Sequence, residues 1–368
     1  MKAKIIYRCS NCGNESSKWV GRCSVCDSWN TYNEVIPEEK GSNRLANLKK
    51  SNAKSVRLLD VISGKSDRIV TSINEFNRVM GGGIVKDSLT IITARPGAGK
   101  STLLLQVAQD IALKGYKVLY ASGEESESQI KSRADRLFQQ VSGNLWVFSD
   151  NIMDNVIANI EEVDPDLVII DSIQTFILEA FPGSRAGSPT QTLECANEML
   201  RIAKNAGRPR AVIMVGQMTK EDELAGLRAL EHLVDTVLVI EGDSAEELRT
   251  LSATKNRFGS TGETGFFSMR EEGMVSIDNP SEFFMTKREG GQLVSGSALT
   301  VVKEGSRAII AEIESLVSTT LTPYPARIGE CLKREQLNTL VSILVQRGGL
   351  PLYDKDIVLK TTGGIKFK

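Results

Sequence analysis

The sequence has no uninterrupted apolar run long enough to form a transmembrane helix, and its N-terminus, MKAKIIYRCSNCG, lacks the apolar core of a signal peptide. We therefore expect a cytoplasmic protein that does not contact membranes. With 41% hydrophobic and 25% charged residues, the composition is that of a globular protein. A length of 368 residues leaves room for two or three domains, each with its own core.

An excess of either charge is also lacking, because 45 Lys and Arg stand against 46 Asp and Glu. Without a global positive field, nucleic-acid binding would have to come from local patches. Residues 40–59 form one such patch, with six basic residues and no acid, although a solvated linker is an equally good interpretation. Histidine is nearly absent, and the single one, His232, is most simply a packing or capping residue in a helix-like segment.

Cysteines are few, but four of the six are grouped as Cys9-x2-Cys12 and Cys23-x2-Cys26. In a reducing cytosol this spacing indicates a metal site and not disulfides. Each CxxC turn presents two thiolates to one ion, and the ten-residue gap allows the second turn to complete a tetrahedral zinc site. A segment of this size has too little core to fold alone, so structural Zn²⁺ would supply the missing stability. A redox CxxC pair is the alternative interpretation.

The hydrophobic pattern divides the chain into four parts. Residues 1–36 are the four-cysteine module and 37–66 a basic linker. In residues 67–280, short apolar runs alternate with helix-like segments, which predicts an α/β domain with a parallel sheet covered on both faces. The predicted strands are 88–94, 117–122, 145–149, 166–171, 211–216 and 236–242.

The last part, residues 281–368, has a different pattern and is predicted to be a smaller α+β unit. Residues 295–318 alternate like two paired strands, and 334–349 has the periodicity of a helix that ends on glycine.

A phosphate-binding loop is predicted where strand 88–94 runs into RPGAGKST and then a helix. Such a loop surrounds phosphates with backbone N–H groups ahead of a helix N-terminus. Lys100 would reach the β- and γ-phosphates of ATP, and the Ser101 hydroxyl would ligate Mg²⁺. Ala94 replaces the usual leading glycine, which is tolerable if its φ is negative. A chance glycine-rich turn is the alternative; the predicted ATP-binding residues are Arg95, Pro96, Gly97, Ala98, Gly99, Lys100, Ser101 and Thr102.

Polar residues end three of the other predicted strands, where ligands bind in open α/β sheets. Asp171 could hold the Mg²⁺ shell through water, and Glu124 or Glu125 could orient and deprotonate the attacking water. Gln217 could donate to a γ-phosphate. A turn-capping aspartate, a solvated acidic helix start and an inert glutamine are the respective alternatives.

The ten residues ATKNRFGSTG, 253–262, contain two cations and no acid. Lys255 and Arg257 are two residues apart, so in a strand they share a face. Arginine fingers stabilise the charge of a transferring phosphoryl group, often from another subunit. If the pair points away from its own phosphate loop, it would serve a neighbour in a ring or filament. A DNA phosphate contact or a solvated turn is the alternative.

With these motifs in place, the chain resembles the bacterial RadA (Sms) family of recombination proteins. The resemblance covers the whole chain and depends on the four-cysteine module, the phosphate loop, IDSIQT, LAGLRALEHLVDTVLVIEGD and above all KNRFG. It implies a RecA-like ATPase that forms a hexameric ring, translocates on single-stranded DNA and drives branch migration or D-loop extension. It also implies that Lys255 and Arg257 act on the adjacent subunit's ATP, as in DnaB-type helicases, and that Glu124 matches the catalytic carboxylate better than Glu125.

The sequence departs from the family pattern at two positions and shortens one expected domain. The loop TARPGAGKST is closer to the DnaB type, and Gln217 stands where RadA proteins generally have histidine. The resemblance implies a Lon-protease-like C-terminal domain, of which residues 281–368 would be a part. No protease activity is expected, because the segment that would match a Lon serine is not in this sequence.

Two functions of different classes follow. The first is a DNA-stimulated ATP motor or helicase with single-stranded DNA, recombination intermediates and other recombination proteins as partners. Its DNA loops would be 181–192 and 218–232, with Arg185, Lys220 and Arg228 on backbone phosphates. The second is an ATP-gated assembly or scaffold ATPase, for which DNA is irrelevant. An ATPase rate that responds to DNA distinguishes the first from the second.

Overall fold

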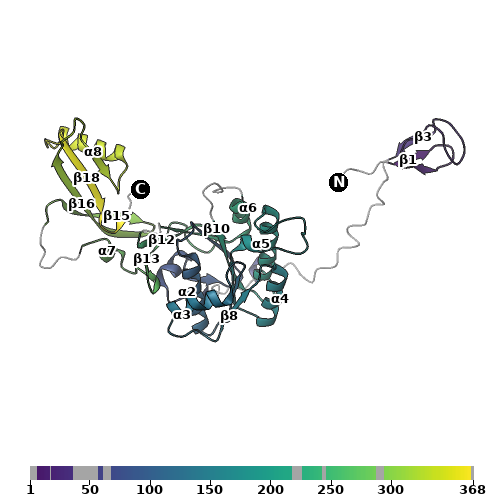
Figure 1. The fold of residues 1–368 in the computed structure, drawn as a ribbon, viewed down its shortest axis with the longest axis horizontal. Coiled ribbons are helices and arrows are strands. Elements are labelled where there is room, and N and C mark those ends of the chain that lie inside the picture. The colour runs from purple at the N-terminus through teal and green to yellow at the C-terminus, as the bar shows by residue number, and fades with distance from the viewer. Residues whose placement is uncertain are drawn as a thin grey trace. The chain divides into compact units, whose positions relative to one another are not determined.

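Two units divide the chain between residues 63 and 64 (Figure 1). This computed structural model describes residues 6–16, 18–35, 57–60, 68–217, 226–242, 246–286 and 294–365. In these ranges no helix is both long enough and apolar enough to span a bilayer. The predicted linker lies outside the described residues, apart from a short 3-10 turn at Leu58–Asp60. The predicted boundaries at 36, 66 and 280 stay predictions.

The first unit contains a small antiparallel sheet with the order β2-β1-β3. Its strands are β1 (Ile6–Cys9), β2 (Glu15–Ser16) and β3 (Tyr32–Val35). Among the described residues its buried apolar side chains are Cys9, Cys23 and Tyr32. Three side chains are too few to hold 30 residues in one fold, so this unit depends on its cysteines.

The second unit is built on a nine-stranded sheet with the order β14-β13-β12-β11-β6-β10-β9-β7-β8. The strands from β11 to β8 are all parallel, and β12, β13 and β14 extend the sheet in antiparallel fashion. The parallel sheet and all six predicted strands are confirmed. The strands are β6 (Leu89–Ala94), β7 (Val118–Ser122), β8 (Leu145–Ser149), β9 (Leu167–Asp171), β10 (Ala211–Gln217), β11 (Thr236–Glu241), β12 (Leu248–Asn256), β13 (Thr264–Arg270) and β14 (Gly273–Ser276).

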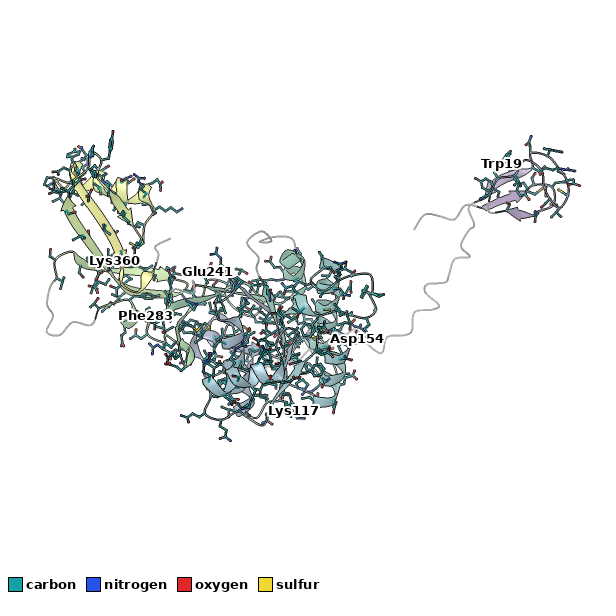
Figure 2. All side chains as sticks on the ribbon, in the orientation of Figure 1. Trp19, Lys117, Asp154, Glu241, Phe283 and Lys360 are labelled. Atoms are coloured by element: carbon teal, nitrogen blue, oxygen red, sulfur yellow. The ribbon has the colours of Figure 1, made fainter. Side chains whose placement is uncertain are left out.

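Helices cover both faces of this sheet, as the near-continuous apolar strands predict. Along β7, Val118 and Tyr120 belong to one buried cluster, and Leu119 and Ala121 belong to the other, because successive strand residues point to opposite faces. The first cluster packs under α1 (Asn74–Val79), α2 (Lys100–Leu113) and α3 (Glu127–Leu137); the second packs under α4 (Met153–Val163), α5 (Pro189–Ala203) and α6 (Gly226–Leu233) (Figures 1 and 2).

The C-terminal residues form a second, four-stranded sheet with the order β15-β16-β18-β17. The paired strands predicted over 295–318 are confirmed as antiparallel β15 and β16, and the predicted helix is confirmed as α8. The elements are α7 (Pro280–Phe283), β15 (Ser297–Glu304), β16 (Arg307–Thr319), β17 (Arg327–Gly329), α8 (Arg334–Gln346), β18 (Lys355–Thr361) and the 3-10 turn Thr362–Gly364. Two further strands, β4 (Arg68–Ile69) and β5 (Ile84–Val85), pair beside α1.

A buried ion pair ties this second sheet to the nine-stranded sheet. Arg307, at the start of β16, donates from Nη1 and Nη2 to the carboxylate of Glu75 in α1 at 3.0 and 2.7 Å. Glu75 is 1% exposed, and it also accepts from the backbone N–H of Phe266 at 2.9 Å. The C-terminal hairpin is therefore held by a charge pair that water does not screen.

We expect Arg307→Met to lower the free energy of unfolding by about 3 kcal/mol, because it leaves a buried carboxylate without its main partner. The figure is at the low end of that range since Arg78 still approaches Glu75 at 3.5 Å. Urea denaturation followed by far-UV circular dichroism measures the change. The control is Lys360→Met, which removes an exposed pair to Glu314 (Lys360 is labelled in Figure 2) and should cost less than about 1 kcal/mol. Equal effects of the two substitutions would contradict the prediction.

Candidate nucleotide site and metal centre

The phosphate loop adopts the conformation that its glycines permit. It joins the end of β6 at Ala94 to the start of α2 at Lys100. Gly97 and Gly99 have φ values of +79° and +100°, in the left-handed region that favours glycine. A Cβ on Gly99 would also collide with the side chain of Met269 and lie 2.9 Å from Sδ of Met274. Ala94 is a strand residue with no positive φ, so replacement of the usual glycine is tolerated there.

A cavity of about 370 Å³ lies over this loop. The Lys100 ammonium donates to the carbonyls of Ala94 and Arg95 at 3.0 and 3.3 Å. Burial lowers the pKa of Lys100, and the nearby carboxylates of Asp171 and Glu124 oppose that shift. Backbone N–H groups, a helix N-terminus and a cation suit an anion such as a nucleotide phosphate. The lining residues are Gly97, Gly99, Lys100, Ser101, Thr102, Arg133, Arg249 and Met269, whereas the exposed Arg95 and Pro96 and the buried Ala98 do not line it.

Two predicted polar residues are in contact at the carboxyl ends of neighbouring strands. Gln217, at the end of β10, donates from Nε2 to Oε1 of Glu124 at 2.7 Å. The same oxygen accepts from the Ser172 hydroxyl at 2.8 Å. Sequence reasoning missed Ser172, although it directly follows Asp171. Two donors thus fix the orientation of the Glu124 carboxylate at the edge where the phosphate loop begins.

The adjacent glutamates have different partners. Glu125 forms a two-bond pair with the Arg133 guanidinium of α3, at 2.7 and 2.5 Å. This pair uses both oxygens of Glu125, whereas the side chains described around Glu124 donate to Oε1 alone. Sequence reasoning missed Arg133, because nothing in the sequence marks a contact across eight residues and a helix start.

Asp171 lies at the end of β9 and accepts from the hydroxyl of Tyr120 at 2.5 Å. Burial and the neighbouring Asp171 raise the pKa of Tyr120 well above its ordinary value, so the phenol keeps its proton and remains a donor. Oxygen ligands from a carboxylate and a hydroxyl suit Mg²⁺. Asp171 and the Ser101 hydroxyl therefore fit a magnesium ion beside the phosphate loop.

Lys255 and Arg257 lie at the opposite edge of the sheet from the phosphate loop. Lys255 pairs with Val237 near the amino end of β11, and Thr236 pairs with Thr90 near the amino end of β6. The four steps along the strand from Thr90 to Ala94 separate the two edges by about 13 Å.

The sequence gives no acidic neighbour for this pair, but the fold supplies one. Arg257 Nη1 is 3.1 Å from Oδ1 of Asp235, whose carboxylate is 3% exposed. Asp235 also accepts from Lys204 and from the backbone N–H of Leu89. The Lys255 ammonium donates to the carbonyl of Glu231. Arg257 therefore has an acidic partner in its own subunit, although 56% of its side chain remains exposed.

Of the three residues predicted to contact DNA, the structure describes the side chain of one. Arg185 is exposed in the loop before α5. The buried Gln191 holds this loop in place by donating to the carbonyls of Phe181 and Ser184 at 3.0 and 3.2 Å. Lys220 lies outside the described residues, and so does the side chain of Arg228. Both predicted loops are too long. Residues 189–192 belong to α5, where Ser188 caps the helix and a proline opens it, and 226–232 belong to α6.

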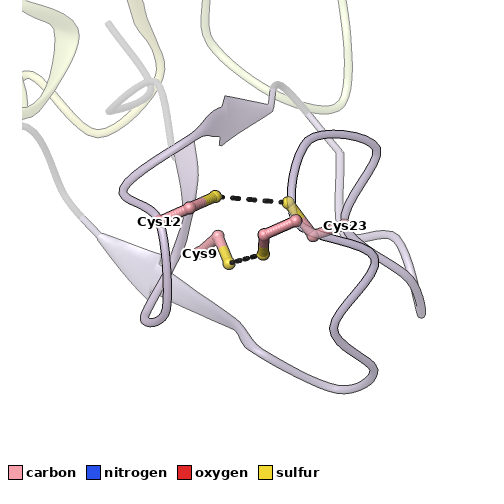
Figure 3. A group of neighbouring side chains, drawn as sticks. Cys9, Cys12 and Cys23 are labelled. Atoms are coloured by element: carbon pink, nitrogen blue, oxygen red, sulfur yellow. Dashed lines mark hydrogen bonds between the residues drawn. The ribbon is translucent and has the colours of Figure 1, made fainter.

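The four predicted metal ligands come together in the first unit (Figure 3). Their sulfur atoms all lie within 4.8 Å of one another, with Cys9–Cys26 at 3.7 Å and Cys12–Cys23 at 3.5 Å. A tetrahedral Zn²⁺ with bonds of about 2.3 Å would separate its sulfur ligands by about 3.8 Å, so the cluster fits zinc.

Local hydrogen bonds prepare Cys23 for a metal. Backbone N–H groups of Cys26 and Val25 lower the pKa of Cys23 to about 6, which favours the thiolate that binds a cation. The Tyr32 hydroxyl donates to the same sulfur and accepts from Asn14, so a second layer of side chains orients the ligand.

Comparison with known proteins agrees with both sites. Residues 7–34 match the family described as rubredoxin metal binding domain, and residues 53–223 match the family described as AAA domain. The chain is 42% identical to DNA repair protein RadA of Bacillus subtilis over 368 residues, which cover 99% of this chain and 79% of the relative. It is 43% identical to DNA repair protein RadA of Listeria monocytogenes, with the same two shares. The protein of that name from Campylobacter jejuni is 39% identical, over 99% of this chain and 80% of its own length.

We expect Cys23→Ser to reduce the zinc content from one ion per chain to near zero. The first unit should unfold with it, because its core is too small without the metal. Atomic absorption measures the zinc, and tryptophan fluorescence reports on the exposed Trp19 and Trp29. The control is Cys195→Ser, a buried cysteine on α5 that should leave the zinc in place. Full zinc content in Cys23→Ser would overturn the four-cysteine site.

Proposed function

We propose a function for this chain from one premise: it belongs to the RadA family of DNA repair proteins. The proposed function is that of a DNA repair ATPase that works as a ring-shaped motor on single-stranded DNA during homologous recombination. The observation that carries the proposal is the separation of two cationic groups. Lys100 lies at the carboxyl edge of the sheet, whereas Lys255 and Arg257 lie at the amino edge.

Residues of one edge would bind ATP and activate water. Backbone N–H groups of the loop and the Lys100 ammonium would hold the phosphates. Ser101 and Asp171 would hold Mg²⁺, which would supply positive charge beside the phosphate oxygens. Glu124 accepts a proton from the attacking water as general base. Gln217 donates to Glu124 and is the last residue of β10, so it would pass a change at the γ-phosphate on to the chain that follows.

Residues of the other edge would complete a neighbour's site. An arginine about 13 Å of strand away from its own loop does not reach its own γ-phosphate. A contact between opposite edges of two copies is heterologous, so it repeats head to tail. It closes as the proposed ring if the rotation between copies closes, and winds as a filament if it does not. Asp235 accepts from Nη1 of Arg257, and no other described residue accepts from this guanidinium, so its remaining donors could bind a phosphate oxygen.

The DNA-binding part of the proposal has one candidate residue whose side chain the structure describes. Exposed Arg185 supports it, and Lys220 and Arg228 belong to the same hypothesis. Phosphate contacts by these residues predict that stimulation of ATP hydrolysis by single-stranded DNA falls steeply with added salt.

We expect Glu124→Gln to bind ATP normally and to lower kcat about 10²- to 10⁴-fold, since the amide cannot accept the proton from water. The matched control is Glu125→Gln, which weakens a half-exposed pair with Arg133 and should change kcat by less than about tenfold. Steady-state ATPase assays and binding of a fluorescent ATP analogue separate the two effects. A larger loss of kcat in Glu125→Gln would reverse the assignment.

The test of the ring proposal mixes two inactive variants, Lys100→Ala and Arg257→Ala, in the presence of single-stranded DNA. Lys100→Ala lacks a working nucleotide site but keeps Arg257 as an arginine finger. Arg257→Ala keeps the nucleotide site but lacks the finger. Removal of an arginine finger should lower kcat about 10³-fold or more, and mixing should restore part of the activity.

The outcomes separate the candidate functions. Mixtures that co-assemble and stay inactive would refute the contribution of Arg257 to a neighbour. A wild-type rate that is the same with and without DNA would refute the motor and favour the ATP-gated scaffold.

A further inference from the structure

A buried arginine on β12 is not used by the proposed function. Arg249 is 2% exposed. Its Nη1 donates to the carbonyls of Glu246 and Leu248 at 2.6 and 2.9 Å, and its buried Nε has no partner among the residues that the structure describes. Its only bonds to the described part of the chain are thus to neutral carbonyls, which do not balance its charge.

The position of Arg249 follows from the strand that carries it. Arg249, Leu251 and Ala253 alternate onto the same face of β12, and the last two pack in the cluster under α2. Thr250 pairs with Glu241 at the carboxyl end of β11, so Arg249 lies at the same edge as the phosphate loop. It lines the cavity over that loop together with Gly97, Gly99 and Lys100.

Two arginines line this cavity, and they differ in their charge partners. The Arg133 guanidinium is neutralised by both oxygens of Glu125. The Arg249 guanidinium has no such partner among the described residues. A buried cation without a counter-ion is unfavourable, and the planar fork of arginine matches the oxygens of a phosphate.

We propose that Arg249 binds the phosphates of the subunit's own nucleotide, as a second cation opposite Lys100 across the phosphate loop. The nucleotide neutralises the buried guanidinium when it binds. This inference deepens the proposed function and depends on its nucleotide site.

The test measures the Kd of fluorescently labelled ATP and ADP, with Mg²⁺ and without DNA. Arg249→Gln removes the charge and should weaken both nucleotides about tenfold or more, the size of a lost hydrogen bond to a charged group. Arg249→Lys keeps the charge without the fork and should fall between. The matched control is Arg270→Gln, which changes a half-exposed arginine on the adjacent β13 that is bonded to Ser268 and Glu247 and should bind normally.

Melting curves without nucleotide separate binding from folding. A melting temperature near that of the wild type together with weaker nucleotide binding supports the proposal. Wild-type affinity in a folded Arg249→Gln overturns it. If Arg249→Gln does not fold, Arg249→Lys decides, because unchanged affinity in that variant leaves Arg249 with a structural role only. Lys100→Ala is measured alongside these variants. If Lys100→Ala binds nucleotide normally, the proposed nucleotide site itself is refuted. If Lys100→Ala loses affinity and Arg249→Gln does not, only the inference about Arg249 is refuted.

Discussion

The proposed site depends on the parallel pairing of the strands from β11 to β8. Parallel pairing places the carboxyl ends of successive strands at one edge, so Glu124, Asp171 and Gln217 all lie at that edge although they are distant in sequence. The helices on both faces bury the strands and leave their ends as the places where polar groups can meet. A change of register by one residue would move these side chains to the other face and separate them.

The same pairing explains how one subunit would contribute to two nucleotide sites, as proposed above. Antiparallel β12 returns beside β11, so its two ends lie at opposite edges of the sheet. Arg249 lies at one end and Lys255 near the other, about 20 Å of strand away. Asp235 fixes the second end by joining Arg257, Lys204 and the backbone of Leu89. The strand is thus anchored both beside the phosphate loop and at the surface proposed to face a neighbour.

Much of the fold could be predicted from the sequence, because its signals are local. Each signal is contained in a short segment of sequence. The signals are six apolar runs, a glycine-rich turn before a helix and two CxxC turns. Contacts between distant segments could not be predicted. Asp235 is 22 residues from Arg257, and no periodicity links them. The predicted loop over 181–192 was too long because the helix signal of Ser188 and Pro189 was not weighed against the glycines before it.

Arg249 shows most clearly what the sequence hides. In LRTLSATKNRFG it is one basic residue among several, and the two that attract attention are those in KNRFG. Only the pairing of β12 distinguishes them, because it buries Arg249 at the edge of the phosphate loop and leaves Arg257 partly exposed at the other edge. A buried cation without a counter-charge destabilises a protein unless something neutralises it. No described residue does so for Arg249, which favours a functional role in which the bound phosphate supplies the negative charge. If Arg249 binds its own subunit's nucleotide and Arg257 binds the neighbouring subunit's nucleotide, one rigid strand would contact two nucleotides. Hydrolysis at one site would then affect the other site without a change of fold.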